Sequence, residues 1–289
     1  MRSANERLQV IDRIKEYAEA GDFYRKVEPG DPVLTPKEAK AVTDRYLKAR
    51  KGTEYKIKRA AAVKLAKIAT KKINKDTVII GTEKIPADIE GAIITSNHFG
   101  PLENTVIRRL TQTANLGRLN IISQVTNFAM TGAIGFLMNY ADTIPISSDP
   151  AYLARDLVSV LKEKLIDNKE TVLLYPEQEM WFNYRKPRPP KRGAYYFAAK
   201  LGVPVISCFV QIVDCGEDDG SGFRKTKYIL HVLDVLYPDT EKTVKENSLF
   251  IGEKDYALKK ECYERVYGKK LTYKFECCDI AGWCGKNNG

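Results

Sequence analysis

Side chains that commonly bind metals are scarce in this sequence. Its 289 residues include two histidines, His98 and His231, and six cysteines without a C-x-x-C pair. Two isolated histidines give little basis for a zinc site, which needs several nitrogen or sulfur ligands. The tail spacing Cys277-Cys278-x5-Cys284 allows a metal or a disulfide, but a packed or solvated tail is the preferred interpretation. We therefore expect no bound metal and reduced thiols.

Long apolar runs are also missing. The longest segment without a charged residue covers 119–141, and several amide and hydroxyl side chains interrupt it. It is therefore a poor membrane span, and we interpret it as a strand followed by a buried helix. The first 15 residues are charged throughout and lack the apolar core of a secretory signal. We expect a cytoplasmic protein that is soluble or peripheral to a membrane.

The positive charge is concentrated in one part of the chain. Residues 1–75 hold 20 Lys and Arg against 10 Asp and Glu, which equals the net charge of +10 of the whole chain. The segment 45–75 alone holds 12 basic residues and one acid. Such a segment could lie on an anionic bilayer, attract an acidic protein, or pack as a basic solvated helix. Nucleic acid is not expected, because few aromatic residues interleave the charges.

Two regions with different patterns follow one another. Residues 1–75 predict a basic N-terminal helical segment with helices over about 1–20, 36–51 and 54–73. Residues 76–289 alternate strand-like and helix-like segments and predict an α/β domain with a mixed, mostly parallel sheet flanked by helices. The expected strands are 77–80, 91–94, 119–125, 143–146, 171–175, 203–213 and 227–235. The expected helices are 102–114, 127–140, 150–167, 192–201 and 250–267.

One histidine occupies a position suited to catalysis. His98 follows the expected strand 91–94, and Glu103 comes five residues later, where the next helix begins. A histidine held in one tautomer by a carboxylate is a ready general base for an alcohol. The spacing alone is weak support, because 37 of the 289 residues are acidic. The strand-to-helix turn strengthens it, and a second motif downstream is needed to confirm it.

The second motif follows the expected strand 171–175. It reads Pro-Glu-Gln-Glu-Met-Trp over 176–181 and continues into a basic, proline-rich loop and a helix that starts at Gly193. Carboxylates, a cationic loop and a glycine helix start after one strand fit the rim of an active site in an α/β sheet. The arginines of this loop are Arg185, Arg188 and Arg192.

Four blocks in this order resemble those of the glycerolipid acyltransferase family, of which lysophosphatidic acid acyltransferase is the best-known member. His98 and Glu103 correspond to its His-x4-acid block, and 135–146 to its second block. Residues 175–180 correspond to the F-P-E-G-T-R block, and 193–205 to the final Gly- and Pro-containing block. The resemblance covers roughly residues 76–240.

The chain departs from the family pattern at cations. Glu103 replaces the commoner Asp, and the Arg that usually follows the second block is absent, with Ser147 or Ser148 in its place. In the third block, Gln178, Glu179 and Met180 replace Gly, Thr and Arg. The missing arginines resemble those that grip a glycerol phosphate, and bidentate Arg contacts give such sites their strength. The acceptor therefore need not be lysophosphatidic acid, unless an arginine of the basic loop substitutes.

The resemblance implies transfer of a fatty acyl group to a hydroxyl of a lysophospholipid or other lipid acceptor, with acyl-CoA or acyl carrier protein as co-substrate and no further cofactor. In this interpretation His98 is the general base, Glu103 orients it, and backbone N–H groups near Gly100 or at Gln178 bind the oxyanion. Residues expected at the substrate are Asn97, Glu177, Gln178, Arg185, Arg188, Arg192 and Gly193.

Several assignments stay open. Phe128, Phe136 and Met138 either line an acyl channel or belong to the core. The basic segment 45–75 is expected to contact an anionic membrane surface at the inner face of the membrane, or acyl carrier protein. The same base could activate water, which would make the protein a thioesterase or esterase. A non-catalytic lipid-binding module of the same fold is the third alternative.

Overall fold

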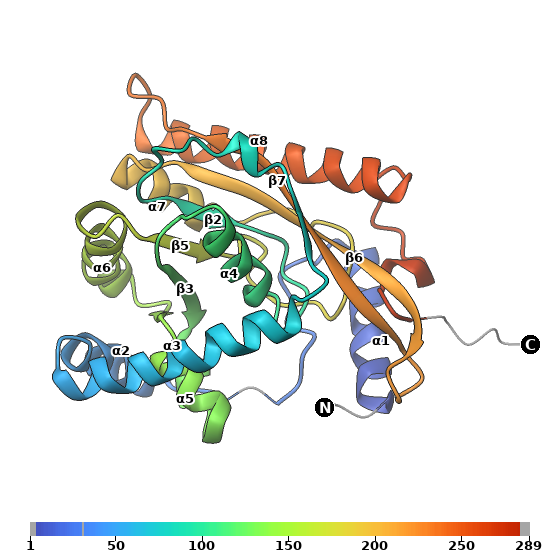
Figure 1. Cartoon of the computed structure of the whole chain (residues 1–289), viewed down its shortest axis with the longest axis horizontal. Helices are drawn as coiled ribbons and strands as arrows, with labels where there is room; N and C mark the ends of the chain where they lie inside the picture. Colours follow the sequence, from blue (N-terminus) through green and yellow to red (C-terminus); the bar gives the residue numbers. More distant parts are fainter. Residues whose placement is uncertain (1–3, 31, 284–289) are drawn as a thin grey trace, which may run out of the picture.

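The computed structural model describes residues 4–30 and 32–283. Three helices come first, α1 (Ala4–Ala20), α2 (Pro36–Ala49) and α3 (Thr53–Ile73), as the sequence predicts. Thr35 caps α2, because its side chain accepts the N–H of Glu38 while the Glu38 side chain accepts the Thr35 N–H. In Figure 1, α1 lies beside the long β6–β7 hairpin, whereas α2 lies at the other end of the molecule and α3 runs from there toward the middle.

A single seven-stranded sheet forms the centre of the molecule, in the order β1-β7-β6-β2-β5-β3-β4. Every neighbouring pair is parallel except β6 and β7, which are antiparallel. The predicted mixed, mostly parallel α/β sheet is therefore confirmed. The strands are β1 (Val78–Ile80), β2 (Ile93–Thr95), β3 (Leu119–Gln124), β4 (Thr143–Ile146), β5 (Thr171–Leu174), β6 (Val205–Asp218) and β7 (Arg224–Leu236).

Helices cover both faces of the sheet. One hydrophobic cluster joins the sheet to α2, to the helical segment 152–167, to α7 and to α8, and a second joins its other face to α4. The segment 152–167 is one continuous helix with π-type turns on both sides of α6. The helices of this part are α4 (Asn104–Thr113), α5 (Gly132–Tyr140), α6 (Val158–Lys162), α7 (Gly193–Leu201) and α8 (Val244–Tyr267).

Two helix starts differ from the sequence prediction. The expected helix 127–140 is broken into a 3-10 turn, Val125–Ala129, and α5, because Met130 and Thr131 between them have extended backbone. A Cβ on Gly135 would lie 2.0 Å from the carbonyl oxygen of Met130, so only glycine fits there. The last helix begins at Val244, before the predicted residue 250, because Thr243 and Glu246 form a capping box there.

The N-terminal helix packs close to the second sequence motif. Val10, Ile11 and Ile14 of α1 share a hydrophobic cluster with Trp181 and Tyr184. The N-terminal residues therefore contribute to the surroundings of the loop that follows β5. Among the described residues, no helix has both the length and the apolar character needed to cross a membrane.

We expect His231 on β7 to make the stability of the fold depend on pH. Burial, and then the charges of Arg265 and Lys84, lower the pKa of His231 from 6.5 to about 4. Between these values the unfolded chain binds a proton that the folded chain does not, so stability falls as the pH drops from about 7 to 4. The loss attributable to this histidine is up to about 3 kcal/mol.

Urea unfolding of wild type and His231→Gln at pH 7 and pH 4.5 measures this contribution. We expect the acid-induced loss of unfolding free energy to be smaller in the variant, which still offers an amide to the neighbouring Gln211. Equal pH dependence in the two proteins would show that His231 titrates normally.

Candidate active site

The first motif forms the turn between β2 and α4. β2 lies between β5 and β6, near the middle of the sheet, and Thr95 is its last residue. His98 therefore sits just beyond the carboxyl end of a central strand, where ligands bind in open α/β sheets. The Asn97 side chain is buried, donates to the carbonyl of Val210 at 3.0 Å and accepts the Val210 N–H at 2.8 Å. Asn97 thus ties the turn to β6 and does not face a substrate.

His98 and Glu103 form a dyad. His98 Nδ1 contacts Glu103 Oε1, and Glu103 Oε2 accepts the N–H groups of Phe99 and Gly100. These contacts fix the buried carboxylate, which holds the imidazole with Nδ1 as the donor, so that Nε2 is the free acceptor. The His98 side chain is 20% exposed, whereas that of Glu103 is 3% exposed. The open Nε2 can therefore accept a proton from a bound molecule.

Tyr175 supports the imidazole from one side. Its ring stacks on that of His98 with centroids 4.2 Å apart and an interplanar angle of 7°. Burial, and then the nearby Glu103 carboxylate, raise the pKa of Tyr175 well above its usual value. The phenol therefore stays neutral, and its ring packs flat against one face of the His98 imidazole.

The second motif meets the first. Glu177 Oε2 accepts the N–H of His98 at 3.2 Å, and the Trp181 N–H donates to the His98 carbonyl at 3.1 Å. Both backbone groups of His98 are thus bonded to the loop after β5. The two motifs therefore lie together at one edge of the sheet, as the proposed role of His98 requires.

Arg188 has a different place from the one expected for a phosphate ligand. Its guanidinium is fully buried, lies 2.9 Å from Glu177, and sits 4.4 Å from the centre of the Trp181 ring. It also donates to the carbonyl of Phe23, in the segment after α1, at 2.8 Å. Arg188 is therefore occupied inside the protein, and Glu177 is its counter-ion rather than a group open to substrate.

The other two arginines of the loop differ, since Arg185 is paired with a carboxylate and Arg192 is exposed. Arg185 pairs with Asp214 at 2.5 Å and donates to the carbonyl of Cys278. Arg192 is exposed at the start of α7, next to Gly193, which is also exposed. Among the three arginines expected to bind substrate, Arg192 is the one that remains on the surface.

The expected oxyanion donors are already engaged. The Gly100 N–H donates to Glu103, and the Gln178 N–H donates to the carbonyl of Tyr175 at 3.0 Å. Gln178 has a left-handed backbone with φ of 64°, and its side chain is exposed. The side chain of Gln178 can reach a substrate, but its N–H group is not free to do so.

The three residues expected to line an acyl channel differ in how deeply they are buried. Phe128 is buried in the core, with its ring 6.3 Å from that of Tyr46. Phe136 and Met138 lie half-buried on α5, and the neighbouring Ile134 is 63% exposed. Phe128 therefore has a core position, whereas α5 offers apolar side chains at the surface.

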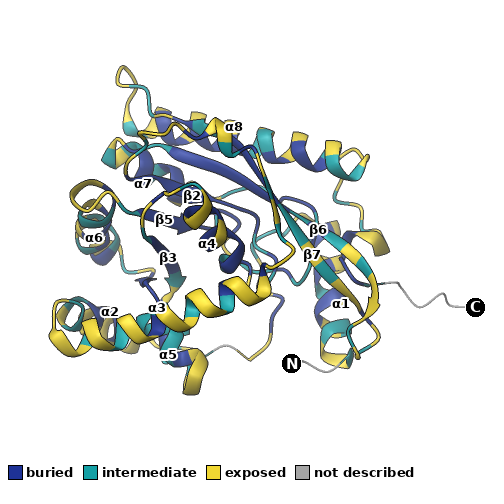
Figure 2. Ribbon diagram, in the orientation of Figure 1, coloured by how far each residue is buried: buried dark blue, intermediate teal, exposed yellow. Residues whose placement is uncertain are grey.

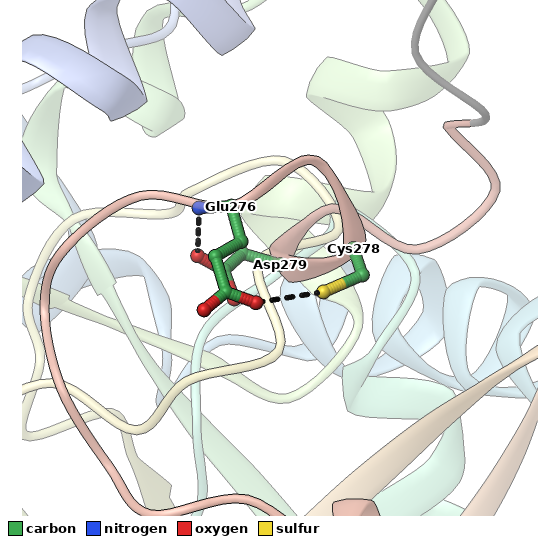
Figure 3. Close-up of side chains that lie close together, drawn as sticks. All are labelled: Glu276, Cys278 and Asp279. Atoms are coloured by element: carbon green, nitrogen blue, oxygen red, sulfur yellow. Dashed lines mark hydrogen bonds between the residues drawn. The ribbon is translucent and has the colours of Figure 1, made fainter.

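Glu276, Cys278 and Asp279 approach one another near the C-terminus, as Figure 3 shows. Two ammonium groups already neutralise them, since Lys269 Nζ lies 2.6 Å from Glu276 and Lys186 Nζ lies 2.6 Å from Asp279. These contacts explain the cluster without a metal. Cys284, the third cysteine of the tail motif, lies outside the described residues.

The segment that contains this site resembles a known protein family. Residues 76–211 match the family model described as "Acyltransferase", and the match contains both motifs. The matched segment covers slightly less than half of the chain and is similar to acyltransferases. The resemblance to acyltransferases drawn from the four blocks is confirmed over this segment.

No curated protein matches the chain. A solved structure that resembles it is the 1-acyl-sn-glycerophosphate (LPA) acyltransferase, PlsC, from Thermotoga maritima. The two share 18% sequence identity, with a TM-score of 0.49, over 94% of this chain and 98% of that chain.

A buried polar cluster that could not be predicted from the sequence lies beneath the turn that carries His98. It joins Thr95 to Tyr195 on α7 and to Asp255 and Lys259 on α8. The spacing of four residues between Asp255 and Lys259 is a signal for a helical ion pair. Such pairs usually face solvent, so the sequence alone does not place this one inside the protein.

Proposed function

We propose that the protein is an O-acyltransferase that moves a fatty acyl group from an acyl thioester to a hydroxyl of a lipid acceptor. The observation that carries the proposal is the open Nε2 of His98, with Nδ1 held by Glu103, inside an acyltransferase domain. Acyl-CoA and acyl carrier protein are the two donor classes that supply such a thioester. No cofactor beyond this co-substrate is needed.

The proposed reaction has two parts. His98 Nε2 takes the proton of the acceptor hydroxyl while its oxygen forms a bond to the thioester carbonyl carbon. The tetrahedral intermediate then collapses, the carbon–sulfur bond breaks, and the imidazolium returns its proton to the leaving thiolate. Glu103 stabilises the imidazolium in between, as the carboxylate of a catalytic triad does. General base catalysis of this kind contributes about 10²–10⁴-fold.

The charges of the site bear on the acceptor. Arg188 and Arg185 are held by Glu177 and Asp214, which leaves Arg192 as the exposed arginine of the loop. A phosphate monoester is bound best by two or more fixed cations. The arrangement therefore favours a lipid acceptor whose head group carries less charge than lysophosphatidic acid.

A panel of acceptors tests the proposal. The purified protein is incubated with labelled palmitoyl-CoA or palmitoyl acyl carrier protein and with lysophospholipids, aminolipids and glycolipids, and the lipids are analysed by mass spectrometry. We expect one acceptor class to gain an acyl chain, with lysophosphatidic acid a poor acceptor. Failure to acylate any lipid, together with no thioester binding, would contradict the proposal.

A membrane surface is the proposed partner of α3. Ile57, Leu65 and Ile68 lie along this helix with 67%, 53% and 58% of their surface exposed. Figure 2 shows α3 exposed along almost its whole visible face. Five lysines of the helix are also exposed: Lys56, Lys64, Lys67, Lys71 and Lys72. Apolar side chains with flanking lysines favour the interface of an anionic bilayer.

Vesicle sedimentation tests this contact. We expect Ile57→Ser/Leu65→Ser/Ile68→Ser to bind phosphatidylglycerol vesicles at least tenfold more weakly, because each buried aliphatic side chain contributes about 1.5–3 kcal/mol. The control is Leu249→Ser/Phe250→Ser on α8, where both side chains are also about half exposed, at 45% and 47%. Equal binding of the two variants would exclude α3 as the membrane contact.

A further inference from the structure

An ion pair on α8 is buried beneath the active site. Lys259 Nζ lies 2.5 Å from Asp255, and their side chains are 6% and 0% exposed. α8 lies beyond residue 211, outside the segment that matches the acyltransferase family. The pair has no part in the reaction described above, although it is one of the most deeply buried charged groups of the chain.

The pair is bonded to the strand that carries His98. Lys259 Nζ donates to Thr95 Oγ1 at 2.9 Å, and Thr95 Oγ1 lies 3.0 Å from both oxygens of Asp255. The Tyr195 hydroxyl donates to Asp255 at 2.5 Å. Thr95 ends β2, so the cluster fixes the backbone three residues before His98.

The same cluster lies beneath both motif loops. Asp255 and Lys259 line a small space together with Ser96 of the first loop and with Glu177 and Arg188 of the second. The second loop holds the backbone of His98, since Glu177 accepts its N–H and the Trp181 N–H donates to its carbonyl. A shift of α8 would therefore affect both the end of β2 and the loop that binds the backbone of His98.

α8 is also held close to α7. A Cβ on Gly252 would lie 2.9 Å from the ring of Tyr195, the residue that donates to Asp255. Buried ion pairs are costly to desolvate, and neutral replacement of both partners is often tolerated, so stability alone does not account for this pair. Its contacts with Thr95 give it another role, the geometry of the site.

We propose that Asp255 and Lys259 are positioning residues, which fix the end of β2 and thereby the orientation of the His98 imidazole toward substrate. The test of this proposal has two measurements. The measurement of activity rests on the proposed function, whereas the measurement of the His98 side chain does not.

The test uses the double variant Asp255→Asn/Lys259→Met, which removes both charges and leaves neither unpaired. The chain has two histidines, so His231→Gln assigns both imidazoles in a nitrogen-15 NMR spectrum. We expect a wild-type Nδ1 proton of His98 far downfield because of its bond to Glu103, and loss or a clear upfield shift of this signal in the double variant. With an acceptor found by the lipid panel, we expect kcat to fall at least tenfold and KM to change less than twofold.

A surface pair on the same helix provides the control. Lys254 lies 3.6 Å from Asp234 on β7, and both side chains are nearly half exposed. Lys254→Met/Asp234→Asn should leave the His98 signal, kcat and the melting temperature unchanged. If the buried double variant does not fold, Thr95→Val removes the connecting hydroxyl alone and is expected to shift the same signal.

The outcomes separate the two proposals. A folded double variant with an unchanged His98 signal and unchanged kcat overturns the positioning role. A changed His98 signal in a protein that transfers no acyl group to any lipid supports the positioning role and contradicts the proposed function.

Discussion

Replacing His98 with alanine should abolish acyl transfer and leave the fold nearly intact. The imidazole is the group of the dyad that accepts the hydroxyl proton. Its loss removes general base catalysis, which raises the rate about 10²–10⁴-fold. The backbone contacts of His98 with Glu177 and Trp181 do not require the side chain, so they persist in the variant. The His98 side chain is 20% exposed, which keeps the cavity left behind open to water.

The comparison is made on initial rates and on thermal unfolding. His231→Gln is the matched control, because it replaces the other histidine, on β7, and should keep full activity at pH 7. An active His98→Ala protein would rule out the mechanism, whatever its acceptor.

Replacing Arg188 with methionine is expected to lower the free energy of unfolding by about 3–5 kcal/mol, because Glu177 is left buried without its counter-ion. The Arg188 guanidinium is fully buried, and the Glu177 side chain is 5% exposed. The same change should lower kcat, since Glu177 and Arg188 support the backbone of His98.

Denaturant unfolding measures the effect, and Arg185→Met is its control in the same loop. Arg185 pairs with Asp214, whose side chain is 33% exposed and also accepts the N–H of Gly282, so its loss should cost less than the loss of Arg188. A stable Arg188→Met protein with a raised KM for the acceptor would instead assign Arg188 to substrate binding, as its place in the sequence suggested.

The contact between His98 and Glu103 could be predicted because it depends on local structure. His98 and Glu103 lie on one short turn, and their contact follows from the spacing and the strand-to-helix geometry. The approach of Glu177 to His98 follows from the topology, because β2 and β5 are parallel neighbours whose carboxyl ends share an edge. The mostly parallel sheet was also predictable, because strands that alternate with helices along a chain usually pair in parallel.

The roles of the basic loop could not be predicted in this way. Arg188 and Glu177 are 11 residues apart, and the sequence does not show that the loop folds back and buries both. The contact of Arg188 with the carbonyl of Phe23 joins parts of the chain that are 165 residues apart. Burial of this kind depends on tertiary packing, which also hid the contact between α8 and Thr95.

The fate of a labelled acyl group tests the central claim most directly. Carbon-14 palmitoyl thioester is followed with wild type and with His98→Ala, in the presence of the acceptor that the lipid panel selects. The account predicts an ester-linked acyl group in the lipid with wild type, and none above background with the variant. Free fatty acid as the sole product with every acceptor would contradict it and would make the protein a hydrolase.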